Sequence, residues 1–222
     1  MRSKRIKHRI SAVLLSLVML MMSPGIAAAE TSGDLSRFRD VFPGQWYYEA
    51  IEFVVTNGYF NGVSETSFAP GQPMTRAMFV TALGRMAGVD AETEQPSPFK
   101  DVDSGSYYSG YVAWASENGI VQGLNDDFFA PDALVTREQI AVFLYRYAKH
   151  IGMDVSIGQT AQPNNSTFNG ENIVSPWAMT AMVWAANRGI MKGTGKGLEP
   201  QAEATRAQVA QMLYSFSLLD KK

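Results

Sequence analysis

The feature that most constrains the fold is an internal repeat. When the sequence is displaced by 61 residues, Trp46 falls on Tyr107, and the match continues without a gap to Thr75 on Thr136. A third copy follows at a displacement of 69 to 70 residues, with one insertion and one deletion, and reaches Thr205. Self-similarity at this period indicates one supersecondary unit that is stacked against its own copies.

Each copy contains two stretches with the apolar spacing typical of an amphipathic helix. The first stretches are residues 47–56, 108–117 and 178–187, and each is followed by a glycine able to end a helix, at Gly58, Gly119 and Gly189. The second stretches begin at Thr75, Thr136 and Thr205. Neither helix can bury its apolar face alone, so we expect the three copies to close a common core with one helix from each at its centre.

Residues 1–29 have the three-part plan of a secretory signal peptide. A basic head precedes an apolar run from Ile10 to Met22, and Ala27-Ala28-Ala29 stands before the expected cleavage point. The run has 13 residues, fewer than the about 20 that a membrane-spanning helix needs. We therefore expect cleavage after Ala29, secretion, and no transmembrane segment afterwards. The alternative is an uncleaved membrane anchor.

Composition and charge exclude several classes of function. The chain of 222 residues has no cysteine, which rules out disulfides, thiolate nucleophiles and Cys-ligated metal sites. Removal of the basic head lowers the Lys and Arg count from 19 to 14 against 21 acidic residues, a net charge of −7. An acidic chain is unsuited to neutralising phosphates, so we expect no nucleic-acid partner. We also expect no cofactor and no metal, because Asn125-Asp126-Asp127 lacks the spaced ligands of a calcium loop.

Each second helix opens on the same Thr-Arg pair, at Thr75-Arg76, Thr136-Arg137 and Thr205-Arg206. The threonine is expected to cap the helix by accepting from the N–H three residues on. Gln139 and Gln208 would complete the capping box in the second and third copies, whereas Met78 leaves the first copy with half a box.

Capping does not explain the arginine of this pair. A cation in the first turn faces the positive end of the helix dipole and costs about 0.3–1 kcal/mol. One interpretation is that the guanidinium and the free N–H groups of the helix start clamp an anionic ligand. The other is that each arginine pairs with Asp40 or Asp101 of a neighbouring copy and fixes the interface. The dipole argument predicts that replacing all three arginines with alanine preserves or slightly raises stability.

Aromatic residues open the first helices, at Trp46-Tyr47-Tyr48, Tyr107-Tyr108 and Trp177. Such rings belong either to the core or against a sugar face, beside the arginines of a carbohydrate groove. The loop glycines Gly62, Gly123 and Gly193 either adopt positive φ in a turn or let a ligand approach the backbone.

With these residues in view, the chain resembles the S-layer homology (SLH) domain family. The resemblance rests on Asp40-Val41, Trp46, Asn57-Gly58, Gly62, Phe68-Ala69-Pro70 and Thr75-Arg76 and on their later copies, and covers about residues 38 to 219. It implies a mostly α fold, with three tandem helix-loop-helix repeats in a pseudo-three-fold arrangement around a central three-helix bundle. The expected repeats are residues 30–88, 99–151 and 168–222, with linkers at 89–98 and 152–167.

The resemblance also implies a function. The family anchors exported proteins non-covalently to bacterial secondary cell wall polysaccharide, often pyruvylated, and the arginine of its helix-opening motif contacts the ketal carboxylate. That role falls here on Arg76, Arg137 and Arg206, in grooves expected to include the threonines, aspartates, aromatic residues and glycines named above. Two departures are Met78 in place of the family's Glu, and Gly170, with Glu171 beside it, where a third Asp is expected.

The leading hypothesis is therefore a non-enzymatic anchor on the cell wall or S-layer surface of a bacterium. Its partner would be an anionic cell wall polysaccharide, with surface-layer proteins as further partners. Because the repeats occupy the mature chain, we expect no separate catalytic domain. The alternatives are a self-assembling envelope protein and a wall-active glycoside hydrolase, in which Asp40, Asp101 or Glu138 would supply the paired carboxylates.

Overall fold

A computed structural model describes residues 35–92, 96–157 and 173–219. The signal peptide expected at residues 1–29 and the departure at Gly170 and Glu171 lie outside these ranges. Within them the chain is helical, with no strand beyond isolated bridges. The elements are η1 (Leu35–Arg37), α1 (Tyr48–Thr56), α2 (Arg76–Met86), α3 (Ser109–Glu117), α4 (Arg137–His150), η3 (Pro176–Ala178), α5 (Met179–Asn187) and α6 (Arg206–Ser217).

The helix boundaries confirm the sequence reading. The first helices α1, α3 and α5 are each closed by a glycine with φ between 64° and 71°, at Gly58, Gly119 and Gly189. The second helices α2, α4 and α6 are capped by threonine side chains that accept from the N–H three residues on. Gln139 and Gln208 complete the capping box and Met78 does not.

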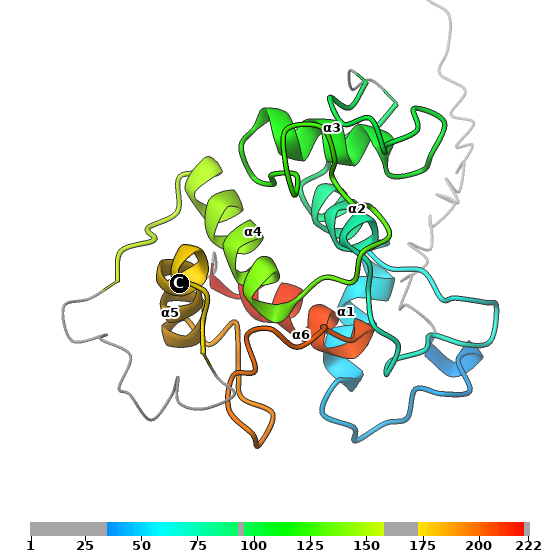
Figure 1. Cartoon of the computed structure of the whole chain (residues 1–222). Helices are drawn as coiled ribbons and strands as arrows, with labels where there is room; N and C mark the ends of the chain where they lie inside the picture. The colour runs from blue at the N-terminus through cyan, green and yellow to red at the C-terminus, as the bar shows by residue number, and fades with distance from the viewer. Residues whose placement is uncertain (1–34, 93–95, 158–172, 220–222) are drawn as a thin grey trace, which may run out of the picture. The chain divides into compact units, whose positions relative to one another are not determined.

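The helix pairs form between copies rather than within them. Figure 1 shows α3 beside α2 and α5 beside α4, and α1 packs against α6 in the same way. Each first helix therefore lies on the second helix of the preceding copy, and the first copy closes on the third. Because every copy completes its neighbour's helix pair, the three copies form one interdependent core.

Backbone hydrogen bonds close a ring at the centre of the three copies. Met74 donates its N–H to the carbonyl of Ala204 at 3.0 Å, Ala204 donates to Val135 at 3.0 Å, and Val135 donates to Met74 at 2.9 Å. Each of these residues stands two positions before a second helix. The ring thus brings the starts of α2, α4 and α6 together.

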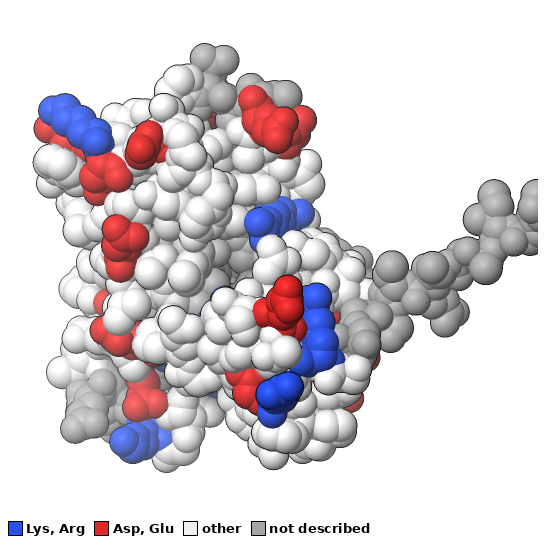
Figure 2. Space-filling model, turned by 90° about the vertical axis from the view of Figure 1, so that its right-hand side faces the viewer, with Lys and Arg blue, Asp and Glu red and all other residues white. Residues whose placement is uncertain are grey.

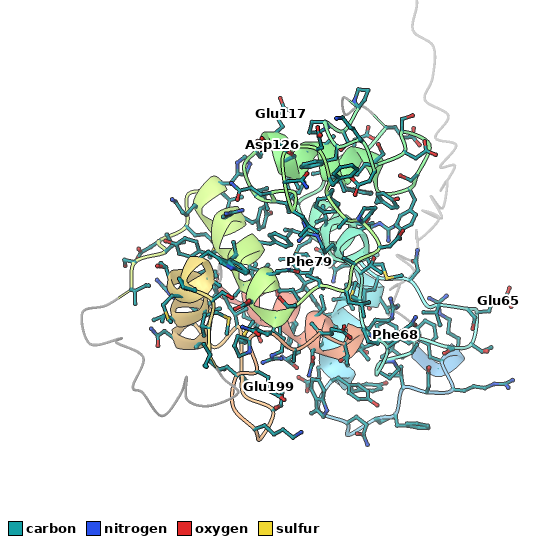
Figure 3. All side chains as sticks on the ribbon, in the orientation of Figure 1. Glu65, Phe68, Phe79, Glu117, Asp126 and Glu199 are labelled. Atoms are coloured by element: carbon teal, nitrogen blue, oxygen red, sulfur yellow. The ribbon has the colours of Figure 1, made fainter. Side chains whose placement is uncertain are left out.

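Aromatic residues fill the core between the second helices. The rings of Phe79 and Phe143 have centroids 5.8 Å apart, and those of Tyr147 and Phe216 are 5.7 Å apart. Figure 3 shows Phe79 in the interior, while Glu65 and Glu117 lie at the periphery. Among the described residues, no helix is long and apolar enough to cross a membrane.

Candidate functional site

The three motif arginines are buried in the interface between copies. Arg76, Arg137 and Arg206 expose only 3%, 2% and 6% of their surface. Each guanidinium reaches two backbone carbonyls of the next copy. Nε donates to Phe129, Leu198 and Phe68 at 2.7–3.0 Å, and Nη2 donates to Gln122, Lys192 and Asn61 at 2.6–2.9 Å.

This arrangement supports the interface interpretation in a modified form. The arginines form no salt bridge with Asp40 or Asp101, because their nearest partners are carbonyl oxygens. The aspartates act on Arg206 and Arg76 through their charge. Aromatic rings also contact the cations, since the Arg76 guanidinium lies 4.5 Å from the Phe129 ring centre and that of Arg206 lies 4.5 Å from Phe68.

The helix starts do not form the free anion site that the sequence suggested. The N–H of Arg76 donates to Ala133 and that of Ala77 to Pro131, both carbonyls of the next copy, and the pattern recurs at α4 and α6. The following N–H is taken by the capping threonine. The closed packing of the copies satisfies these donors, so the expectation of free backbone N–H groups was wrong.

Asp40 and Asp101 hold the loop that presents these carbonyls. Asp40 accepts from the Ser67 hydroxyl at 2.6 Å and from the N–H groups of Phe68 and Ala69 at 2.9 and 2.8 Å. Asp101 accepts from the equivalent N–H groups of the second copy at 2.8 and 2.7 Å. The loop bends through Ala69 with φ of 57°, a left-handed conformation that alanine adopts only at a cost. The aspartates are therefore structural supports for the arginine contacts.

In the third copy a carboxylate also lies near the motif arginine, and it belongs to Glu199. Glu199 stands where the other copies have Ala69 and Ala130, has φ of 45°, and accepts from the Thr194 hydroxyl. Its charge acts on Arg137 as those of Asp40 and Asp101 act on the other two arginines. Gly170 and Glu171, where the sequence placed the doubt about this copy, lie outside the described ranges, and the sequence analysis did not single out Glu199. The sequence signal that could have identified Glu199 is an acidic residue at the repeat position where the other two copies have alanine.

Burial lowers the pKa of all three arginines. The pKa of Arg76 falls to about 10, with the charge of Asp101 acting in the opposite direction, and burial lowers the pKa of Arg137 and Arg206 in the same way. At neutral pH the guanidinium groups remain charged. Each site therefore keeps a cation in a largely dehydrated setting, where its attraction for an anion is stronger than in water.

Two surface grooves contain these arginines and draw residues from all three copies. One, of about 450 Å³, is lined by Arg137 of the second copy, Gly193 and Gln208 of the third, and Trp46 of the first. The other, of about 520 Å³, is lined by Arg206, Gly62, Met78 and Tyr107, again from three different copies. In the repeat register, the residues equivalent to these linings are Arg76, Gly123, Gln139 and Trp177.

Of the opening aromatic residues, Tyr47, Tyr48 and Tyr108 pack against the core as one interpretation expected, whereas that interpretation was wrong for the other three rings. Trp46, Tyr107 and Trp177 expose 61%, 59% and 59% of their surface. Trp46 and Tyr107 rest edge-on against Tyr47 and Tyr108, which are partly buried. Neither threonine caps nor aspartates line the two grooves, so the structure gathers only the arginines, aromatic residues and glycines of the expected set.

The loop glycines are required by close backbone approach rather than by positive φ. A Cβ at Gly62 would lie 2.5 Å from the carbonyl oxygen of Ser64, and one at Gly123 would lie 2.3 Å from that of Asn125. Gly193 is less tightly enclosed, with the carbonyl oxygen of Gly197 at 3.1 Å. Since φ is negative or extended at all three positions, the turn interpretation in terms of positive φ was wrong.

The carboxylates considered for hydrolysis are engaged in structural hydrogen bonds. Besides Asp40 and Asp101, the buried Glu138 accepts from the N–H of Ser175 at 3.0 Å and from its hydroxyl at 2.8 Å. Asn125 accepts from the N–H groups of Asp127 and Phe128, which closes its own loop. Within the described ranges, no three His, Asp or Glu side chains gather to hold a metal ion.

The chain belongs to the S-layer homology domain family. The family model matches residues 37–78, 98–141 and 171–210, one match for each copy. Membership indicates a location at the bacterial cell surface and an anchoring role there.

Curated relatives include both enzymes and surface-layer proteins. The chain is 29% identical over 96% of its length to an endoglucanase of Bacillus sp. (strain KSM-635). It is 25% identical over 89% of its length to the S-layer protein sap of Bacillus anthracis, and 27% identical over 86% to the surface-layer 125 kDa protein of Lysinibacillus sphaericus. The matches cover 22%, 22% and 15% of those proteins. The chain therefore spans less than a quarter of the length of these relatives.

Proposed function

We propose that this chain anchors non-covalently to the bacterial cell wall by binding an acidic secondary cell wall polysaccharide in its three grooves. One observation carries the proposal. In each of the two lined grooves, a buried arginine from one copy meets an exposed aromatic ring from another and the loop backbone of the third. Cation, ring face and close backbone are the elements that recognise an acidic sugar.

The arginines keep donors for a ligand after building the interface. A guanidinium has five N–H donors, and the two carbonyl bonds leave about three of them, including both on Nη1. Nη1 of Arg137 and Arg206 makes no hydrogen bond within the described part of the chain. The interface and ligand roles of the arginine are therefore compatible, and a carboxylate such as a pyruvyl ketal suits the remaining donors.

The surface outside the grooves offers less to an extended anion. Figure 2 shows Lys, Arg, Asp and Glu in small separate clusters on the face drawn, with uncharged surface between them. This distribution favours binding at discrete grooves over a continuous basic track. It also favours a binding module over a hydrolase, because Asp40, Asp101 and Glu138 are committed as acceptors.

Exposed aromatic residues provide a test that leaves the fold intact. We expect Trp46→Ala and Tyr107→Ala to weaken co-sedimentation with native sacculi, while Phe42→Ala, which removes a ring that is 56% exposed and lines neither groove, leaves it unchanged. Calorimetry would then compare a pyruvylated wall fragment with the same fragment after removal of the ketal. Equal affinity for both fragments would contradict the proposal. Sedimentation that persists on sacculi stripped of secondary polymer would favour self-assembly.

A further inference from the structure

A second cation lies in both of the observed grooves, and an equivalent one lies near the third buried arginine. Arg85 lines the groove of Arg206, and Lys192 lines that of Arg137. Beside Arg76, the Nη2 of Arg146 donates to the side-chain oxygen of Gln122 at 3.0 Å. The backbone carbonyl of the same Gln122 accepts from Arg76, so both arginines bind one glutamine residue.

All three copies have a second cation, but the third copy places it at a different repeat position. Arg85 and Arg146 occupy the same position in α2 and α4, but the third copy has Ser215 there. In that copy the charge comes instead from the loop, because Lys192 stands where the other copies have the neutral Asn61 and Gln122. The helix does not need the arginine for its own sake, so the retained property is a positive charge in the groove.

Within the described residues, these second cations form no ion pair with an acidic side chain. The ion pairs among the described residues are Lys100 with Asp127 and Arg188 with Asp154, and neither pair lines the two grooves. Arg85 instead donates to the carbonyl of Tyr59 at 3.3 Å. In a chain whose mature part is expected to carry more acidic than basic residues, three cations without an ion pair in the described ranges, near three buried arginines, point to an anion supplied from outside.

The buried arginine approaches a ligand from one side only, which leaves the other side of a bound carboxylate for a second cation. Its Nε and one N–H of Nη2 bind carbonyls, so the side-on pair of donors is occupied and the end-on donors of Nη1 and Nη2 are left for a carboxylate. We propose that Arg85, Arg146 and Lys192 bind the same acidic group of the glycan as the buried arginine, which makes each groove a two-cation carboxylate site. This inference rests on the proposed function.

The test removes the second charges and leaves the buried arginines in place. The triple variant Arg85→Gln, Arg146→Gln, Lys192→Gln is titrated with a pyruvylated wall fragment and with the same fragment lacking the ketal. We expect about a tenfold loss of affinity for the acidic fragment, the loss of one charge-assisted contact per groove, and little change for the neutral one. The matched control is Lys149→Gln, which removes an exposed cation of α4 outside both grooves.

A rescue variant separates charge from local structure. Lys192→Gln combined with Ser215→Arg moves the third cation from the loop to the helix position used by the other copies, and we expect it to restore the affinity lost in Lys192→Gln. Unchanged affinity of the triple variant, an equal loss in Lys149→Gln, or no rescue would overturn the inference and leave the proposed function standing. A wild-type chain that does not distinguish the two fragments would overturn both.

Discussion

Replacing Arg206 with alanine should destabilise the fold, which is opposite to the effect expected from the helix dipole alone. The substitution removes hydrogen bonds to the carbonyls of Phe68 at 2.7 Å and Asn61 at 2.6 Å. A hydrogen bond from a charged group contributes about 1.5–3 kcal/mol, and the contact with the Phe68 ring adds about 0.5–2 kcal/mol. The opposing terms are the recovered hydration of the guanidinium and a dipole relief of about 0.3–1 kcal/mol.

The balance of these terms is a loss of about 3 kcal/mol in the free energy of unfolding. For a chain of this size that corresponds to a fall of roughly 6–12 °C in melting temperature. Urea unfolding of the mature chain, followed by circular dichroism, measures the change directly. Arg206→Lys should lose about half as much, because a lysine keeps the charge and can reach one carbonyl.

The matched control for this prediction is Arg39→Ala. Arg39 is exposed, and its side chain makes no hydrogen bond or ion pair within the described ranges, so its removal should change stability by less than about 0.5 kcal/mol. If Arg206→Ala were as stable as the wild type, the carbonyl contacts would contribute nothing net. The arginine would then be retained for its ligand alone.

Three further substitutions test the loops that support the grooves. Gly62→Ala should lower the free energy of unfolding by about 1–3 kcal/mol, measured by thermal melting, because its Cβ would lie 2.5 Å from a carbonyl oxygen. Gly193→Ala, where the same distance is 3.1 Å, should cost much less. Equal losses in the two variants would contradict the packing argument. Burial tends to raise the pKa of Asp40, but its hydrogen bonds outweigh this and hold the pKa below 3.8. Asp40→Asn should therefore be less stable than wild type by about 1–3 kcal/mol at neutral pH, with a gap that narrows as the pH falls through the folded-state pKa below 3.8; a gap independent of pH would refute this. Glu138→Ala should cost about 2–3 kcal/mol in urea unfolding, and a double-mutant cycle with Ser175→Ala should show coupling rather than additive losses.

The sequence was sufficient for features that depend on near neighbours in the chain. Helix starts, capping boxes and closing glycines are set within about one turn by side chains such as Gln139 and Gln208. The repeat itself identified the family, because many positions agree in order and spacing. The incomplete capping box of the first copy, where Met78 cannot bind back to the helix start, was likewise evident from the sequence.

Features that depend on contacts between copies could not be read in this way. A helical apolar stripe shows that a face is buried but does not name the helix that covers it, so the pairing of α1 with α6 was not predictable. The same holds for the acceptors of Arg206, which lie 138 and 145 residues away in the sequence. Only the folded loops bring Glu199 near Arg137 and Lys192 into the groove of that arginine.

The sequence by itself thus determined the repeat, the helices and the presence of one helix-opening arginine per copy. Only the tertiary structure decided that these arginines are buried, that the helix N–H groups are occupied, and that the aromatic residues remain exposed. The physical reason is cyclic closure. When the third copy packs against the first, every copy acquires donors, acceptors and packing partners from its neighbours, and the local pattern does not record which groups those are.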